Sequence, residues 1–138
     1  MSQENVEAVR RSFEVFNRDG LEAAFRGGFL SPEVVVDLSG TGIPGLGVYS
    51  GHDEVTAFFE QDWFTTFPFA EWEIVVEELV DHGDCVVNMS RQRGRGAKSH
   101  VAAELELTNI HTLRDGQIVQ IEVYRDRKQA LEAAGLSE

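Results

Sequence analysis

Apolar residues recur with spacings of three and four near the beginning of the chain, and this spacing predicts amphipathic helices. The first helix is expected over residues 4–18, and a shorter one over residues 21–26 ends at a pair of glycines. Three consecutive valines at 34–36 then predict a short strand. The glycine-rich loop at 39–47 lacks the lysine of a phosphate-binding loop, so we interpret it as a flexible flap.

A third amphipathic helix is predicted from Ser50 to Phe67, with Ser50 as its N-cap and Asp53 as the reciprocal capping residue. After Pro68 the apolar period changes, and four strands are expected over residues 72–80, 85–93, 101–113 and 118–125. An Asp-Gly pair between the last two strands favours the left-handed geometry of a tight hairpin.

The chain closes with a predicted helix over residues 127–134, which has Asp126 as its N-cap and Gly135 just past its end. Helices that are segregated from a meander of antiparallel strands indicate an α+β fold. The 138 residues fit a single domain, 1–138. A long antiparallel sheet twists, and wrapped on the helices it forms a cone whose open mouth favours a pocket.

Composition narrows the expected partners. The net charge of −12 disfavours nucleic acid, and the local basic cluster of Arg91, Arg93, Arg95 and Lys98 is interpreted as a solvated hairpin end. No apolar run can span a bilayer and the N-terminus does not resemble a signal peptide, so we expect a cytoplasmic protein without a membrane partner. Cys85 is the single cysteine, and no metal site is expected because no Cys/His spacing resembles one.

Two polar residues interrupt the apolar face of the third meander strand. Alternation places Asn109 and His111 on its leucine-rich side, which is expected to face the core. A polar pair in that setting is either hydrogen-bonded within the core or part of a cavity wall, and both alternatives stay open. His111 is in addition a candidate acid or base.

Asp37 ends the valine strand directly before the glycine-rich loop. A carboxylate near apolar walls is a candidate general base that moves a proton between carbon atoms. The alternative is a strand-terminal aspartate that accepts hydrogen bonds in the turn. The candidate catalytic residues are therefore Asp37, Asn109 and His111.

Several aromatic residues are candidates for the wall of the same pocket, with ordinary core packing as the alternative. They are Phe13, Tyr49, Phe59, Trp63 and Tyr124. Asp62 lies on the apolar stripe of the third helix and is either a pocket acid or a solvated residue at the rim.

The segments 4–17, 49–55, 112–118 and 125–136 resemble the SnoaL-like branch of the NTF2-like superfamily, and the similarity extends over nearly the whole chain. The resemblance implies a cone in which a curved sheet surrounds a long helix. It also implies a homodimer. The superfamily includes ketosteroid isomerase, polyketide cyclases and members without known catalysis, so function has to be argued from the site.

The resemblance to ketosteroid isomerase implies roles for individual residues. Asp37 falls at the position of the general base, and Asn109 at the position of a protonated aspartate that donates to an oxyanion. The tyrosine of the isomerase falls at Ser12, which offers no phenol.

Two hypotheses for function follow. The first is a cofactor-independent isomerase, cyclase or dehydratase that acts on a small hydrophobic molecule, with Asp37 as the base and Asn109 or His111 polarising a carbonyl. The second is a non-catalytic binding or dimerisation module of the same fold, to whose core or interface Val119, Ile121 and Val123 contribute.

Overall fold

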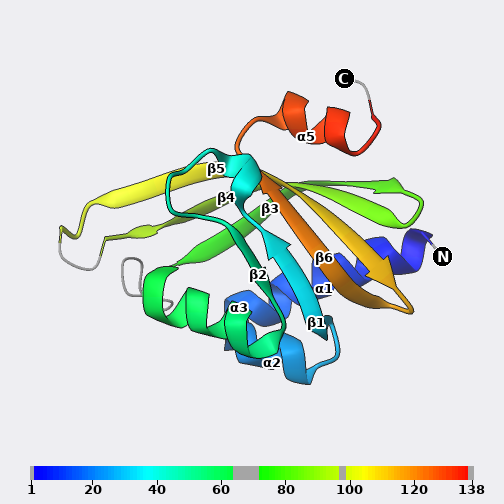
Figure 1. Ribbon diagram of the computed structural model, residues 1–138, viewed down its shortest axis with the longest axis horizontal. Helices are drawn as coiled ribbons and strands as arrows, with labels where there is room; N and C mark the ends of the chain where they lie inside the picture. The colour runs from blue at the N-terminus through cyan, green and yellow to red at the C-terminus, as the bar shows by residue number, and fades with distance from the viewer. Residues whose placement is uncertain (1, 64–71, 97–98, 137–138) are drawn as a thin grey trace.

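The computed structural model describes residues 2–63, 72–96 and 99–136, in which helices pack against a curved, unclosed sheet (Figure 1). The helices are α1 (Ser2–Asp19), α2 (Leu21–Arg26), α3 (His52–Phe58) and α5 (Arg127–Ala133). The strands are β1 (Leu30–Asp37), β2 (Val48–Ser50), β3 (Glu73–His82), β4 (Cys85–Arg95), β5 (Ala102–Arg114) and β6 (Gln117–Tyr124). Two short turns, the 3₁₀ turn η1 (Ser39–Thr41) and the π-helical turn η2 (Phe59–Trp63), follow β1 and α3. The expected α+β class is confirmed.

Within the described residues, six strands form one sheet in the order β2-β1-β6-β5-β4-β3. Strands β3 to β6 form the predicted antiparallel meander. However, β1 runs parallel to β6, so the expectation of a purely antiparallel sheet is wrong at this edge. A pairing between strands so distant in the sequence leaves no turn signal, and the three-residue β2 that joins β1 is too short to show alternation.

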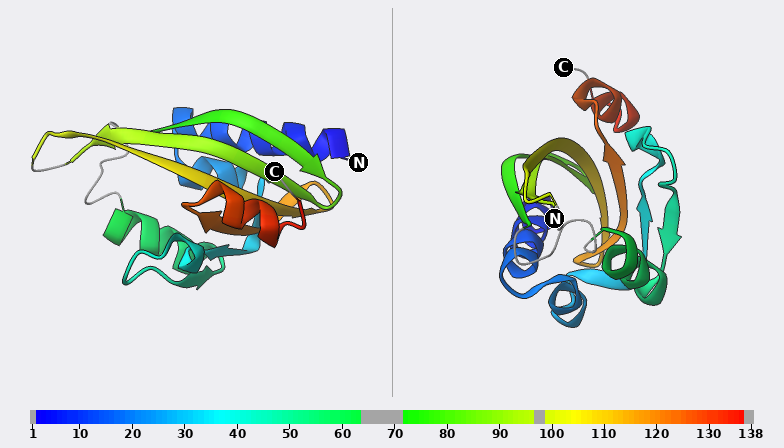
Figure 2. Two further views of the ribbon diagram at one scale, coloured as in Figure 1. Left: turned by 90° about the horizontal axis from the view of Figure 1, so that it is seen from above. Right: turned by 90° about the vertical axis from the view of Figure 1, so that its left-hand side faces the viewer.

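Helices α1, α2 and α3 lie on the concave side of the sheet, and Figure 2 shows the sheet curling around them. The apolar stripe of α1 buries Val9 and Phe16, while α3 buries Val55. Val34 and Val36 of β1 are buried on the same inner side. The main core therefore lies between these helices and the inner face of the sheet.

Helix α5 covers part of the outer face, where Leu131 packs against Val87 and Met89 of β4. Asp126 caps the helix as predicted, because its carboxylate accepts hydrogen bonds from two backbone N–H groups of the first turn. Gly135 ends it with a φ of 81°. The last helix thus follows its sequence prediction closely.

The third helix differs from its prediction at its start. Ser50 belongs to β2, Gly51 is the N-cap, and the carboxylate that reaches back is that of Glu54 rather than Asp53. The Ser50 backbone N–H donates to Glu54 Oε1 at 3.0 Å. The predicted end at Phe67 lies outside the described residues.

Two members of the basic cluster on the β4 side of the β4–β5 hairpin form ion pairs with carboxylates of neighbouring strands, while Arg95 donates to the His100 carbonyl at 3.0 Å. Arg91 contacts Glu77 at 2.7 Å, and Arg93 contacts Glu73 at 2.8 Å. Lys98 lies outside the described residues. Within the part of the chain that the structure describes, no helix combines the length and the apolar character needed to cross a membrane.

Candidate functional site

A cavity of about 120 Å³ lies between the inner face of the sheet and the helices. Its walls are mostly apolar and come from many elements, for example Leu21 of α2, Val36 of β1, Leu107 of β5 and Ile121 of β6. A cavity of about 150 Å³ admits benzene in another protein, so this volume suits a ligand of roughly one ring.

Aromatic side chains form one part of the wall. Of the aromatic residues expected to line a pocket, Phe13 of α1 and Phe59 and Trp63 of η2 lie here. Trp63 meets Trp72 edge-on, with ring centroids 5.8 Å apart. The Trp72 indole Nε1–H donates to Gln92 Oε1 at 2.9 Å, which fixes the orientation of that ring.

Asn109 and His111 also line the cavity, on the inner face of β5 as alternation predicts. Their exposed fractions are only 4% and 1%. Asn109 Oδ1 and His111 Nδ1 are nevertheless without a hydrogen-bond partner among the described residues. The two side chains therefore do not satisfy each other through these atoms, and each such buried group costs about 1–3 kcal/mol when it is left unpaired.

Burial changes the acid–base behaviour of His111. Loss of hydration lowers the pKa of His111 from 6.5 to about 4, while a hydrogen bond with the Val86 backbone acts as a smaller cause in the opposite direction. The rings of His111 and Phe13 are nearly perpendicular, with centroids 5.5 Å apart. His111 is consequently neutral at pH 7.

Two further polar side chains, which the sequence analysis did not single out, lie beside this pair. Asn88 of β4 is directly opposite Asn109, and Ser90 is two residues further along the same face. Their exposed fractions are only 0% and 2%. Asn88 Oδ1, Asn88 Nδ2 and Ser90 Oγ also have no partner within the described residues. Because Val86, Asn88 and Ser90 alternate along β4, the sequence could have placed both polar residues on the same face as the buried Val86.

Asp37 takes a different position. Because Val34, Val36 and Leu38 face the cavity, alternation turns Asp37 to the outer face of the sheet, beside Glu122 of β6. Its Oδ1 accepts hydrogen bonds from the backbone N–H and the hydroxyl of Ser39. This is the turn arrangement that the sequence left open as the alternative to a base.

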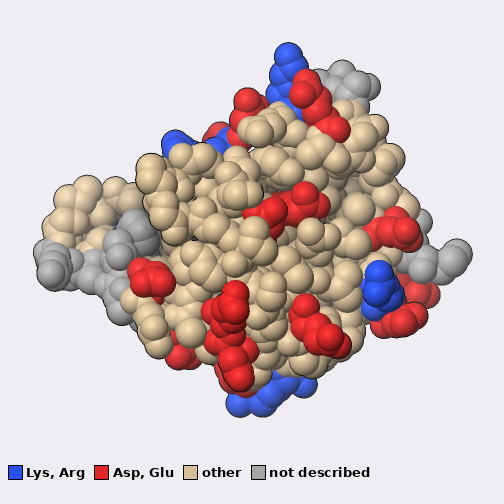
Figure 3. All heavy atoms as spheres, viewed as in Figure 1, with Lys and Arg blue, Asp and Glu red and all other residues tan. Residues whose placement is uncertain are grey.

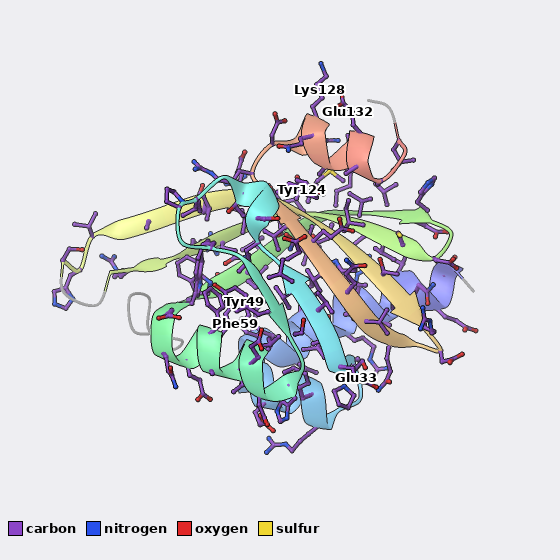
Figure 4. The ribbon with its side chains drawn as sticks, in the orientation of Figure 1. Glu33, Tyr49, Phe59, Tyr124, Lys128 and Glu132 are labelled. Atoms are coloured by element: carbon purple, nitrogen blue, oxygen red, sulfur yellow. The ribbon has the colours of Figure 1, made fainter. Side chains whose placement is uncertain are left out.

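The other candidates also lie outside the cavity lining. The ring of Tyr49 stacks on Phe58 at 4.2 Å, next to the wall residue Phe59 (Figure 4). Tyr124 lies at the far end of β6, where its hydroxyl donates to Glu122 at 3.3 Å. Burial, and then the charge of Glu122, raise the pKa of Tyr124. Asp62 is exposed on η2.

A family model for the SnoaL-like domain matches residues 9–121, which is most of the chain. The protein belongs to the SnoaL-like domain family. A comparison with curated proteins found no match.

Solved structures similar to this SnoaL-like domain share its fold. An NTF2-like protein of unknown function from Burkholderia pseudomallei is 26% identical, with a TM-score of 0.73, over 96% of this chain and 97% of that chain. A proposed SnoaL-like polyketide cyclase from Jannaschia is 24% identical, with a TM-score of 0.74, over 97% and 92%. TerC, co-crystallised with polyporic acid, is 22% identical, with a TM-score of 0.74, over 96% and 98%.

The cavity of this SnoaL-like domain offers hydrogen bonds but no charge. None of its described lining residues is Asp, Glu, Lys or Arg. Besides Asn109 and His111, the polar lining residues are Ser12, whose hydroxyl donates to the Val9 carbonyl at 2.7 Å, and Gln92. The position of Ser12 on the apolar stripe of α1 could have identified it from the sequence. In the described ranges, no three His, Cys, Asp or Glu side chains are grouped so that they could hold a metal ion.

Proposed function

We propose that this SnoaL-like domain binds a small, largely apolar molecule in the cavity between its helices and the inner face of the sheet. The observation that carries the proposal is the combination of apolar walls with Asn109 and His111, two buried polar side chains that have atoms without partners among the described residues. Binding sites for small molecules typically have this composition, because apolar walls supply affinity and few polar groups set the orientation.

Physical chemistry and the comparisons support the proposal in different ways. Apolar ligand surface removed from water stabilises a complex by about 25 cal/mol per Å² before the entropic cost of association. The structural relative TerC was co-crystallised with polyporic acid, which supports the binding of a small molecule by this fold.

Native mass spectrometry of the purified protein against a panel of lipids, steroids, polyketides and single-ring aromatic compounds tests the proposal. We expect retention of at least one apolar ring compound at a ratio of one per chain. The variant Val36→Trp would fill the cavity with a larger side chain and should abolish retention. A protein that retains nothing from the panel would contradict the proposal.

A second candidate function is catalysis without a cofactor on the same bound molecule, by proton transfer, isomerisation, cyclisation or dehydration. The favouring observation is that His111 is neutral and lines the cavity beside the Asn109 amide. His111 would accept a proton from a carbon atom, and Asn109 would donate to a developing oxyanion. A pKa of about 4 makes His111 a weak base at neutral pH, which favours plain binding over catalysis. Asp37 as the general base stays a prediction.

The proposal also retains a homodimer and a cytoplasmic location as predictions. The structure restricts the residues available for pairing. Ile121 and Val123 line the cavity, so they belong to the core, while Val119 stays a candidate for an interface.

A further inference from the structure

The inner face of the sheet carries a row of four buried polar side chains, which we call the polar row: Asn88, Ser90, Asn109 and His111. None is more than 4% exposed, and every one has a side-chain atom without a hydrogen-bond partner among the described residues. Buried polar groups in folded proteins are nearly always paired, so four neighbouring groups of this kind are able to bind a polar partner.

The register of the sheet brings the polar row together. Asn88 is directly opposite Asn109, Val86 is opposite His111, and Ser90 is opposite Leu107. Side chains opposite each other on one face of an antiparallel pair have Cβ atoms about 5 Å apart. Asn109 and His111 form part of the cavity wall, while Asn88 and Ser90 lie beside them on β4.

The chemistry of the polar row restricts its partner. Asn109 Oδ1 can only accept a hydrogen bond, and Nδ1 of a neutral imidazole accepts when the proton is on Nε2. A partner must therefore present a donor. The Ser90 hydroxyl and the two asparagine amides of the row can donate in return, so a group that both donates and accepts fits best.

Charge restricts the partner further. The polar row contains no ionised group, because burial keeps His111 neutral at pH 7. The described lining residues add no Asp, Glu, Lys or Arg. A carboxylate or an ammonium ion in this cavity would lose its hydration without gaining a counter-ion, which strongly disfavours its binding.

We infer that the cavity selects an uncharged, single-ring molecule that carries a hydroxyl group, and that Asn109 and His111 of the polar row bind this hydroxyl while the aromatic wall contacts the ring. The inference rests on the proposed function, because it names the class of ligand for the same cavity. The cavity volume of about 120 Å³ limits the ligand to about one ring, and the acceptor atoms without partners require a ligand that can donate a hydrogen bond, such as a hydroxyl group.

Titration calorimetry with matched probes tests the inference at pH 7. Phenol and toluene have nearly the same shape but differ in the hydroxyl, while benzoate and benzylammonium carry charges of opposite sign. We expect phenol to bind about 5 to 30 times more tightly than toluene, as one or two net hydrogen bonds would give. Neither benzoate nor benzylammonium should bind measurably. Binding of toluene as tight as that of phenol, or tighter binding of either ion, would overturn the inference.

Variants identify the groups responsible. Asn109→Leu should bring the affinities for phenol and toluene within about twofold while toluene still binds. His111→Phe retains a ring against Phe13 and should also reduce the preference for phenol over toluene. This second variant provides the test if Asn109→Leu does not fold. The matched control is Thr108→Val, which removes a buried hydroxyl from the opposite face of β5 and should preserve the preference. An undiminished preference in both Asn109→Leu and His111→Phe would contradict the role of the polar row.

The outcomes separate this inference from the proposed function. Toluene binding without a preference for phenol overturns the inference and leaves the proposed cavity function standing. If neither toluene nor phenol binds and the wider panel is not retained, both are overturned. Retention of a charged ligand alone overturns the inference only.

Discussion

Burial of His111 in the core lowers its pKa and leaves one of its ring nitrogens able to accept a hydrogen bond. The imidazole is 1% exposed, and its pKa is lowered to about 4 by loss of hydration. A residue held in this way cannot form an ion pair at neutral pH, but its Nδ1 stays available for a hydrogen bond with a neutral partner. The burial that suits His111 to recognition thus has a measurable effect on stability.

The stability of the protein should depend on pH through His111. At pH 7 the imidazole is mainly neutral in both the folded and the unfolded chain. Below pH 6.5 the unfolded chain gains a proton, while the folded protein does not until about pH 4, so stability falls as the pH falls through this window. His111 alone should remove about 2 kcal/mol between pH 7 and pH 5, as measured by urea unfolding of the wild type and His111→Phe.

The control for this measurement is His82→Gln, which removes an exposed imidazole and should retain the pH dependence of the wild type. A His111→Phe variant that loses as much stability as the wild type between pH 7 and pH 5 would contradict the lowered pKa.

Asp37→Asn tests whether the outer-face carboxylate takes part in ligand binding. We expect the affinity for a ligand retained in the cavity to change less than about twofold, because Asp37 points to the other face of the sheet. The amide oxygen of the replacement side chain can still accept from Ser39, so folding should be preserved. Calorimetry with the retained ligand measures the effect, and loss of binding or of turnover would support the general base predicted from the sequence.

At the residue scale, the sequence predicted which face of the sheet a side chain occupies where polar and apolar residues alternate, but not where they do not. Asn109 and His111 stand out among leucines, so their inner position could be predicted. Asp37 follows a run of three valines that are apolar on both faces, and such a run contains no information on which face the next residue takes. Only the pairing of β1 with its neighbours fixes that face.

Among the elements, α5 packs on the outer face of the sheet through a small apolar cluster around Leu131. Leu131→Ala should lower the free energy of unfolding by about 2–5 kcal/mol, because it opens the cluster with Val87 and Met89. Loss of the cap in Asp126→Ala should cost about 1 kcal/mol. Urea unfolding measures both changes.

The control for α5 is Glu132→Ala, an exposed position, which should change stability by less than about 0.5 kcal/mol. Figure 4 shows Lys128 and Glu132 on the side of α5 away from the sheet. Ligand binding should persist in Leu131→Ala under native conditions, since the cavity lies on the opposite face. An unchanged stability in Leu131→Ala would show that the cluster around Leu131 does not stabilise the fold.

Local sequence patterns predicted most of the helices and strands, but they did not predict how the strands pair in the sheet. The period of the apolar residues located α1, β3 to β6 and α5, and the Asp115-Gly116 turn has the predicted left-handed geometry, with φ of 53° and 81°. The parallel pairing of β1 with β6 joins segments some 85 residues apart, as in the pair Asp37 and Glu122. No local propensity encodes a contact over that separation. The sequence could therefore predict that the fold contains a pocket, but not which residues of β1 line it.

At the scale of the whole molecule, charge is distributed unevenly. The chain has 24 acidic and 12 basic residues, yet the surface over β1, β2 and β6 is mostly uncharged, with a few acidic groups (Figure 3). Val48 of β2 is 53% exposed on this outer side, opposite Asp37. An apolar residue on a sparsely charged face of an otherwise acidic protein is a reasonable centre for self-association.

The homodimer implied by the family resemblance should therefore respond to salt and to Val48. Two copies that each carry a charge of −12 repel each other, so screening should strengthen the dimer between about 0.05 and 0.5 M salt, over which the Debye length falls about threefold.

Light scattering should give twice the 15.4 kDa of the chain, and Val48→Ser should shift the mass towards that of one chain. Val101→Ser is the matched control, because Val101 is 64% exposed and directly precedes β5, and its loss should leave the mass unchanged. In Figure 1 the β4–β5 hairpin extends away from β1 and β2. A single-chain mass at every salt concentration would show that the homodimer prediction is wrong, and an equal effect of the two variants would show that association does not use the face that contains Val48.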